Sequence, residues 1–473
     1  MIATLARFVR ERLPLLLLIS ALVVSGALAS TAVPADSHPN AVVTPGPKKP
    51  KRPTKKRRHR VRPVHHKRQN GDPPLAPPVV VPPPPPLPPP PPPPPLLAEQ
   101  TPANGSADGR IDAPVRVRFT VPVDAASVTP QTLIVRDAAG VPVPAAVSYD
   151  AATFAVTATP AAALVPDAAY SAAVSGVRSA TGSSLPAATW PFRTAPVLLA
   201  AGDVAGRAKV EPNPTYCTGN AGAKDTGKLL DTLAGQIAML GDTTYPVGAK
   251  IEFDQCFDPA WGRHKPRLHP VIGNHEYQTP QAAPYFDYFG ASAGPRGDAW
   301  YSFDMGSWHI VVLNANCGVV GCGPGSRQEQ WLRNDLIAHP SRCSIAMWHQ
   351  PRVASGEYGQ NDEVATLFSD FFQAGGDIVL NGHEHTYERI VPMNAKLGAD
   401  PANGVRTFVV GTGGIPLLPI KVSVPQTELY DNSSLGVLRL VLLSNGYEWS
   451  FRPTPGGTNH DSGSSTCHDA PRS

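Results

Sequence analysis

Beyond residue 29, the 473-residue sequence has no apolar run as long as the roughly 20 residues that span a bilayer. It has 6 cysteines, and none has zinc-finger spacing, which argues against a structural metal site built on cysteine. The formal net charge is only +4, so the chain as a whole is not strongly basic. These shortages exclude a protein with several membrane-spanning helices and a zinc-finger protein.

The first 29 residues have the pattern of a secretory signal. Three arginines (Arg7, Arg10 and Arg12) precede an apolar run over 13–29 that ends in Ala-Leu-Ala, a small-residue cleavage site. The alternative is an uncleaved membrane anchor, for which this run is slightly short. We expect an exported protein, either secreted or at the cell surface.

The cysteines fit an oxidising compartment, as an exported protein requires. They are Cys217, Cys256, Cys317, Cys322, Cys343 and Cys467. Six cysteines allow 15 pairings, and the sequence does not choose among them. We prefer Cys217 with Cys256, both in loops after predicted strands, and Cys317 with Cys322 across a Gly-rich turn.

Residues 30–98 have the composition of a disordered linker. Segment 48–68 holds 12 Lys or Arg and no acid, and removing these charges from the net +4 leaves about −8 for the rest. Such a segment is attracted to polyanions. For an exported protein we expect an anionic cell-wall polymer or lipid headgroups as its partner, and no specific nucleic acid. The alternative is a solvated linker without a partner.

A proline-rich stretch follows the basic segment within the same linker. Residues 73–95 are largely proline, and at about 3.1 Å per residue in polyproline II geometry they would span roughly 70 Å. We interpret this stretch as a stiff spacer that holds the folded part away from a surface.

Residues 99–195 show the pattern of an all-β sandwich. Short alternating runs at 115–119 and 132–136 are separated by turn signals, for example at 137–140 and 181–182. The order of these runs resembles bacterial Ig-like domains. No group of acids, histidines and cysteines in this region suggests chemistry, so we interpret it as a spacer or adhesion module.

Residues 196–455 alternate apolar strands with helical stretches, such as 226–240 and 362–374, which predicts an α/β domain. Residues 456–473 are rich in Gly, Ser, Thr and Asp and read as a flexible tail, held down only if Cys467 pairs. Five short segments of the α/β region each follow an apolar run, at 202–203, 241–245, 273–276, 348–351 and 382–389.

These five segments carry the candidate metal ligands. The carboxyl ends of strands converge on one crevice, so the segments can bring carboxylate, amide, phenol and imidazole groups together. The candidate ligands are Asp203, Asp242, Asn274, His349, His383 and His385.

Two metal ions about 3.5–4 Å apart need a bridging carboxylate, and Asp242 is the natural bridge. Asp203 and His385 would complete one metal site, while Asn274, His349 and His383 would complete the other. These mixed oxygen and nitrogen sets suit iron, zinc or manganese. On an extended segment His383 and His385 point the same way, and a small twist would let each reach a different metal.

These segments, in this order and spacing, resemble the calcineurin-like metallophosphoesterase superfamily over about residues 197–451. Many members have a His two residues after the first Asp, whereas this chain has Ala205 there and Tyr245 three residues after Asp242. That combination resembles the purple acid phosphatase branch. The resemblance implies an α/β fold in which a β-sandwich is flanked by helices.

The resemblance also assigns ligands to two metal ions, Fe(III) together with Fe, Zn or Mn. It implies that Tyr245 is a tyrosinate ligand of the ferric ion, with Asp203, Asp242 and His385. The divalent ion would be held by Asp242, Asn274, His349 and His383.

The expected activity is hydrolysis of phosphomonoesters, by attack of hydroxide formed from a metal-bound water of lowered pKa. His275 lies next to ligand Asn274 and is free to face the substrate, so we expect it to stabilise or protonate the leaving oxygen. We expect Glu276, Glu388 and Arg389 to support the site structurally. Two alternatives stay open: a phosphodiesterase or nucleotidase with the same metals, and a wall-binding protein with a vestigial catalytic domain.

Overall fold

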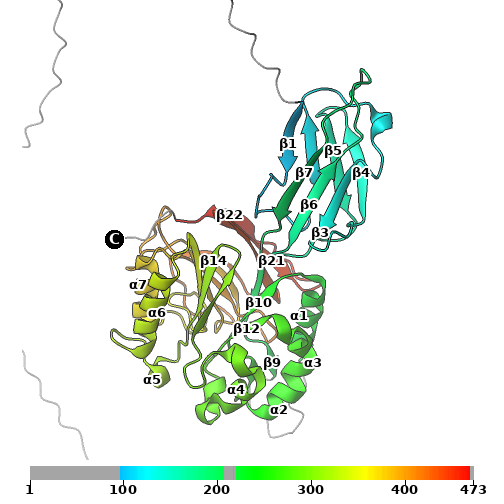
Figure 1. The fold of residues 1–473 in the computed structure, drawn as a ribbon. Coiled ribbons are helices and arrows are strands. Elements are labelled where there is room, and N and C mark those ends of the chain that lie inside the picture. The colour runs from blue at the N-terminus through cyan, green and yellow to red at the C-terminus, as the bar shows by residue number, and fades with distance from the viewer. Residues whose placement is uncertain (1–95, 207–216, 218–219, 469–473) are drawn as a thin grey trace, which may run out of the picture. The chain divides into compact units, whose positions relative to one another are not determined.

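The computed structural model describes residues 96–206, 217 and 220–468 (Figure 1). The predicted signal over 1–29 and nearly all of the predicted linker over 30–98, with its basic and proline-rich stretches, lie outside the described residues. Within the described part, no helix combines the length and the apolar character needed to cross a membrane.

The region after the linker is an all-β sandwich of two antiparallel sheets. One sheet has the order β1-β2-β5-β4, with β1 Leu97–Thr101, β2 Val115–Phe119, β4 Ala145–Asp150 and β5 Ala155–Pro160. The other has the order β3-β6-β7, with β3 Leu133–Asp137, β6 Ala169–Val174 and β7 Ala188–Arg193. Strand β1 begins inside the segment predicted to be linker.

Alternation along the strands builds the core of this sandwich. Val115, Val117 and Phe119 of β2 are buried while the residues between them are not, which is the period of two expected for a half-buried strand. Trp190 of β7 is fully buried in the same core. The predicted all-β sandwich is therefore confirmed.

The α/β region contains two larger sheets. The first has the order β12-β10-β8-β20-β21-β22, with β8 Val197–Ala201, β10 Gln236–Leu240, β12 Leu268–Val271, β20 Gly436–Leu443, β21 Gly446–Pro453 and β22 Ser462–Thr466. Strands β8, β10 and β12 are parallel neighbours. Nearly every residue in β8 and β10 is buried, as in strands covered on both faces.

The second sheet has seven strands in the order β13-β14-β15-β16-β18-β17-β19. They are β13 Tyr301–Met305, β14 Trp308–Val312, β15 Cys343–Met347, β16 Ile378–Asn381, β17 Tyr387–Ile390, β18 Arg406–Val410 and β19 Thr427–Asp431. Its central strands β14, β15, β16 and β18 are parallel. A separate two-stranded sheet pairs β9 Ala205–Gly206 with β11 Thr244–Tyr245.

Helices flank these sheets on two sides (Figure 1). One group consists of α1 Ala221–Thr232, α2 Lys250–Glu252, α3 Asp258–Trp261 and α4 Ala283–Phe289, and the other of α5 Cys317–Val320, α6 Arg327–Ala338 and α7 Ala365–Gln373. A π-helical turn is η2 Phe253–Phe257, and the 3-10 turns are η1 Ala125–Ser127, η3 Gly262–Arg267, η4 Glu276–Gln278, η5 Pro280–Ala282, η6 Gly290–Ala293 and η7 Asp362–Val364.

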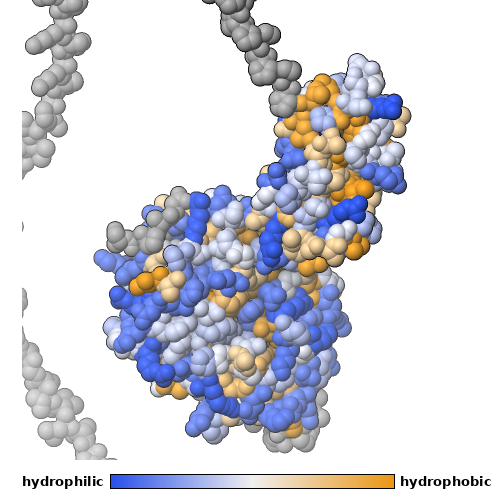
Figure 2. Space-filling model, viewed as in Figure 1, coloured by the Kyte–Doolittle hydropathy of each residue, from blue (hydrophilic) through white to orange (hydrophobic). Residues whose placement is uncertain are grey.

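The α/β sandwich flanked by helices is the predicted fold class. Apolar side chains of the strands, such as Leu199, Met239 and Ile345, are fully buried between the layers. Figure 2 shows hydrophilic residues over most of the visible surface of this region, with apolar residues scattered between them.

The helical stretch predicted over 226–240 is wrong in its second half, where the apolar run 237–240 forms the strand that was expected before the segment at 241–245. Helix α1 ends at Thr232, and strand β10 occupies 236–240. Gly235 separates them with φ +135°, and a Cβ there would lie 2.5 Å from the carbonyl oxygen of Val197. A helix cannot continue through that conformation, and only glycine fits the close approach to β8.

The tail over 456–473 is expected to be flexible unless Cys467 pairs, and its described part is held in place. Strand β22 extends the first sheet by pairing with β21, and Cys467 forms a disulfide with Cys343 of β15. The two pairings preferred from the sequence, Cys217 with Cys256 and Cys317 with Cys322, are confirmed. The condition under which the tail would be held down is therefore met.

Candidate metal centre

Each of the five predicted segments begins at the end of a parallel strand. Asp203, Asp242 and Asn274 follow β8, β10 and β12 of the first sheet, and His349 and His383 follow β15 and β16 of the second. The carboxyl ends of the two sets of strands therefore supply one site from both layers.

Tyr245 lies at the centre of one group of predicted ligands. Its hydroxyl oxygen is 2.6 Å from Oδ1 of Asp203, 3.0 Å from Oδ2 of Asp242 and 3.1 Å from Nε2 of His385. The Tyr245 residue is only 2% exposed. The four residues that the resemblance assigned to a ferric ion therefore converge on one point.

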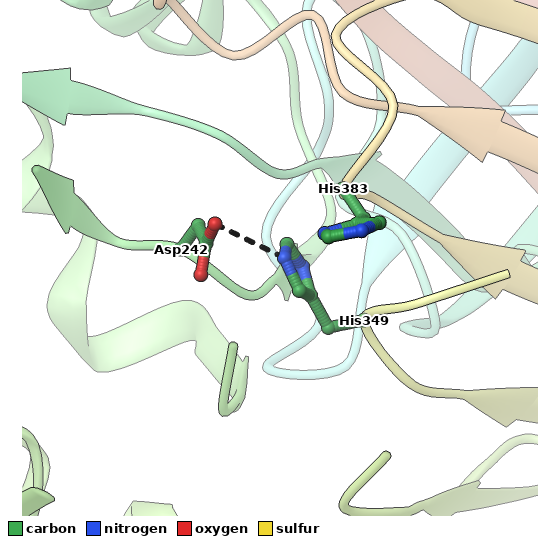
Figure 3. Close-up of side chains that lie close together, drawn as sticks. All are labelled: Asp242, His349 and His383. Carbon is green, nitrogen blue, oxygen red and sulfur yellow. Dashed lines mark ion pairs between the residues drawn. The ribbon is translucent and has the colours of Figure 1, made fainter. Parts of the chain in front are cut away.

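Asp242, His349 and His383 form a second group (Figure 3). One ligand atom from each lies within 4.8 Å of the others. Nε2 of His349 is 3.1 Å from Oδ2 of Asp242, and the His349 and His383 rings are 5.0 Å apart between centroids. Asp242 thus takes part in both groups, as a bridging ligand would.

The donor atoms of this site fit metal ions. Oδ1 of Asn274 is buried and has no hydrogen-bond partner, whereas Nε2 of His349 forms an ion pair with Asp242 at 3.1 Å. An unsatisfied buried polar atom costs about 1–3 kcal/mol, and an ion bound at Oδ1 of Asn274 would offset that cost. Nδ1 of His349 is bonded to the carbonyl oxygen of Leu240 at 2.7 Å, which leaves Nε2 to face the site as in metal-binding histidines.

The electrostatics of the site also favour bound cations. Burial and the carboxylates of Asp203 and Asp242 raise the pKa of the Tyr245 phenol well above its ordinary value. Burial also raises the pKa of Asp203. Deprotonating both groups at one buried point beside Asp242 would therefore require compensating positive charge.

The pKa values of the two histidines move in opposite directions. Burial alone would lower the pKa of His349, but the carboxylates of Asp242 and Asp203 raise it to about 9. Burial and the neighbouring His349 lower the pKa of His383 to about 3. The Asp242 carboxyl, although buried, has a lowered pKa because His349 and His275 lie beside it.

Three predicted ligands have left-handed backbone conformations that non-glycine residues seldom adopt. The φ angles are +61° at Asp203, +47° at Asp242 and +72° at His383. Such conformations gather at functional sites, where the surrounding structure holds them. The extended segment predicted for His383 and His385 is wrong, because the chain turns at His383 and an amide-to-carbonyl bond of 2.9 Å joins Glu384 to Gly382.

His275 lies at the accessible edge of the site. Its side chain is 28% exposed, its Nδ1 is 2.5 Å from the carbonyl oxygen of Pro246, and its Nε2 is 3.7 Å from Oδ2 of Asp242. Its ring centroid is 4.3 Å from that of Tyr245. With Nδ1 bonded to a carbonyl, Nε2 is the nitrogen that faces the site.

Glu276 braces two of the ligand-bearing loops, in keeping with its predicted supporting role. Its fully buried carboxylate accepts hydrogen bonds from the amides of Thr243 at 2.7 Å and Gly273 at 2.8 Å. These bonds join the loop of Asp242 to the loop of Asn274. Burial and the charge of Asp242 raise the pKa of Glu276 to about 7.

The other two supporting residues lie further from the ligand atoms. Glu388 accepts a hydrogen bond from the amide of Ser355 at 2.8 Å. Arg389 forms ion pairs with Asp461 and Glu428, which agrees with the structural ion pair expected for it.

Glu384 was not assigned a role from the sequence, although it stands between His383 and His385. Its buried carboxylate accepts three backbone hydrogen bonds, from Glu357 at 2.8 Å and from Tyr358 and Gly359 at 2.7 Å each. Its position between two predicted ligands was the available signal, but its partners lie about 25 residues away. Sequence spacing therefore could not identify them.

A second histidine and aspartate group lies at the opposite ends of the strands. His309 of β14, Asp335 of α6 and His339 have ligand atoms within 4.8 Å of one another. However, both ring nitrogens of His309 are already bonded to carboxylates, to Asp304 at 2.7 Å and Asp335 at 2.8 Å. Burial alone would lower the pKa of His309, but these carboxylates raise it, so we interpret the group as a buried ion pair.

Comparisons with known proteins match both folded regions. Residues 197–387 match the family model of calcineurin-like phosphoesterases, and residues 92–194 match that of a bacterial Ig-like domain. Purple acid phosphatase 15 of Arabidopsis thaliana is 29% identical over 174 residues, covering 33% of this chain and 32% of that protein. Purple acid phosphatase 22 of the same plant is 27% identical over 216 residues, covering 43% of this chain and 46% of that protein.

Among solved structures, the purple acid phosphatase PPD1 from yellow lupin seeds is 17% identical, with a TM-score of 0.48. That match covers 77% of this chain and 74% of the lupin chain. The matches to the two curated Arabidopsis relatives, in contrast, span less than half of the length of those proteins.

Proposed function

Because residues 197–387 form a domain of the calcineurin-like phosphoesterase family, we propose that the protein is a metal-dependent phosphatase that hydrolyses phosphomonoesters at a two-metal centre. The observation that carries this proposal is the convergence of the ligand set on two points that share Asp242. The names of the purple acid phosphatase relatives support the same reaction class.

The two groups of candidate ligands correspond to two metal positions. Asp203, Asp242, Tyr245 and His385 would hold a ferric ion, and Asp242, Asn274, His349 and His383 would hold iron, zinc or manganese. Bound cations would neutralise phosphate oxygens and lower the pKa of a water molecule. The position of the Tyr245 hydroxyl, within 3.1 Å of Asp203, Asp242 and His385, supports its assignment to the ferric position.

The chain's own residues orient the substrate and supply a proton. Hydrolysis forms a P–O bond to water and breaks the P–O bond to the ester oxygen, which must gain a proton to leave as an alcohol. His275 is the exposed group at the edge of the site, and with both ring nitrogens protonated its Nε2 can donate that proton. The proton released by the attacking water would restore the doubly protonated ring. Glu276 and Glu384 hold the loops on which this geometry depends.

Monoester specificity is tested by comparing an aryl phosphate with the matching bis-aryl phosphate. We expect kcat/KM for the monoester to exceed that for the diester by at least about tenfold, which is about 1.4 kcal/mol in transition-state binding. A preference for the diester would instead identify a phosphodiesterase with the same metal ligands.

Tyr245→Phe is expected to remove a visible absorption band from the purified protein. A phenolate bound to ferric iron absorbs visible light, and phenylalanine has no oxygen to bind. The measurement is a visible spectrum together with metal analysis. A wild-type protein that contains iron but has no such band, or a band that survives the substitution, would rule out the tyrosinate assignment.

We also propose that the protein is exported, as the pattern of residues 1–29 indicates. Three disulfides among the described residues support an oxidising compartment. The segment over 48–68 would then meet anionic wall polymers or lipid headgroups. Recovery of the protein only from the cytosol would contradict export.

A further inference from the structure

The loop over 355–359 is fastened to Glu384, which stands between two predicted metal ligands. The buried Glu384 carboxylate accepts hydrogen bonds from three consecutive amides of this loop, and a Cβ on Gly356 would lie 2.4 Å from Oε2 of Glu384. Hydrogen bonds to a charged acceptor are shorter and stronger than neutral ones. The loop is therefore held in one position beside His383.

This loop presents the ring of Tyr358 to the site. The ring centroid lies 4.6 Å from that of His383 in a tilted arrangement, and Tyr358 is 56% exposed. An exposed aromatic ring held rigidly beside a metal ligand offers a flat apolar face to a substrate.

A pocket of about 300 Å³ has Tyr358 and His383 among its lining residues. Its lining includes Pro351, a second apolar surface, and Gln350, whose buried Oε1 has no hydrogen-bond partner. A volume of this size is at the lower end for small-molecule sites and suits a single ring.

The charge of this pocket is acidic. Among its described lining residues, the side chains with a full charge at neutral pH are those of Asp362 and Glu363. A second phosphate group on the substrate would meet these carboxylates. Like charges in contact are destabilising. Arg352 forms an ion pair with Asp362 at 2.7 Å, so the uncompensated acid in the described lining is Glu363.

The pocket is within reach of one bound phosphate group. Nε2 of His275 is 3.7 Å from Oδ2 of Asp242, and the ligand atoms of Asp242 and His383 lie within 4.8 Å of each other. Because His383 belongs both to the candidate metal centre and to the pocket lining, the ester group of a phosphate bound at that centre can extend into the pocket.

We propose that this pocket binds the organic group of the substrate and selects monophosphate esters of ring-containing alcohols or phenols over polyphosphorylated substrates. This inference rests on the proposed phosphatase function and names the substrate class of the same site. Tyr358 and Pro351 provide the apolar contacts, Gln350 accepts a hydrogen bond from the ring substituent, and the Glu363 carboxylate disfavours a further phosphate.

The ring contact is tested with benzyl phosphate and ethyl phosphate, which both release a primary alcohol and differ by the ring. We expect wild-type protein to prefer benzyl phosphate in kcat/KM, chiefly through KM. In Tyr358→Ala the benzyl-to-ethyl ratio should fall about tenfold, while Tyr358→Phe, which keeps the ring, should retain the preference. Calorimetric binding of benzylphosphonate and ethylphosphonate should show the same order without turnover.

The charge selection is tested with the bisphosphate of a benzenedimethanol, in which one benzene ring carries two CH2–O–phosphate groups. Glu363→Gln should reduce the preference for benzyl phosphate over this bisphosphate about threefold, and added salt should reduce it in the wild type. Asp287→Asn is the matched control, because Asp287 is an exposed acid of α4 outside the pocket lining. We expect it to leave both ratios unchanged.

The outcomes separate the two proposals. If wild-type protein hydrolyses neither benzyl nor ethyl phosphate, the phosphatase function fails and the pocket's role fails with it. If both are hydrolysed and Tyr358→Ala leaves their ratio unchanged, the pocket proposal alone is overturned. A bisphosphate that is preferred by wild-type protein would also overturn the pocket proposal.

Discussion

Replacing Asp242 by asparagine is expected to lower kcat for a phosphomonoester by on the order of 10³-fold or more. Asp242 belongs to both ligand groups, so the substitution removes the charge that would bridge the two cations. Cations at such a site stabilise transition-state charge by several kcal/mol, and about 4 kcal/mol corresponds to 10³-fold. The measurements are steady-state kinetics and the ratio of metal to protein.

Asparagine should preserve the fold at this position. Asp242 has φ +47°, a conformation that asparagine tolerates better than most residues, and the amide has nearly the same shape as the carboxylate. Circular dichroism and thermal unfolding should therefore change little, and Asp287→Asn serves as the control. If Asp242→Asn keeps activity within about tenfold of wild type, the two-metal mechanism fails. If wild type is itself inactive but binds cell-wall material, the vestigial alternative is supported.

Replacing His275 by alanine is expected to lower kcat by about 10²–10⁴-fold for an alkyl phosphate, the range for loss of a general acid. The loss should be much smaller for p-nitrophenyl phosphate, whose leaving oxygen needs no proton. The reason is geometric: Nδ1 is bonded to the Pro246 carbonyl, and Nε2 faces the site from an accessible side chain. The measurement is kcat for both substrates in the same preparation.

The contrast between the two substrates distinguishes proton donation from a positioning role. His275 also contacts the ring of Tyr245, so a merely structural role would lower kcat for both substrates by the same factor. His339→Ala is the matched control, since the His339 side chain is 47% exposed and lies at the end of α6. We expect it to change neither rate.

Much of the architecture could be predicted because it depends on local patterns. Buried strands such as β8 and β10 are continuous apolar runs, and the alternation in β2 is visible in the sequence itself. The residues at which helices and strands begin and end could be predicted less well. The end of α1 and the start of β10 depend on the close approach of Gly235 to Val197, a contact that no local pattern contains.

The candidate metal ligands could be predicted from the sequence, but the contacts that hold their loops in place could not. The polar residues stand directly after strands, so their convergence followed from the strand pattern. The Glu384 carboxylate, in contrast, bonds to a loop about 25 residues earlier in the chain. The Tyr358 ring is brought to His383 by that loop, and nothing in the spacing of these two residues indicates the contact.

The sequence by itself determined the order of the domains, the α/β pattern and the identity of the candidate metal ligands, because burial and strand ends are encoded locally. The tertiary structure alone decided that Cys343 pairs with Cys467, that the chain after 456 adds strand β22, and that Tyr245 meets Asp203 across 42 residues. These features depend on contacts between distant segments. Their geometry is set by packing of the two sheets, which residue order does not specify on its own.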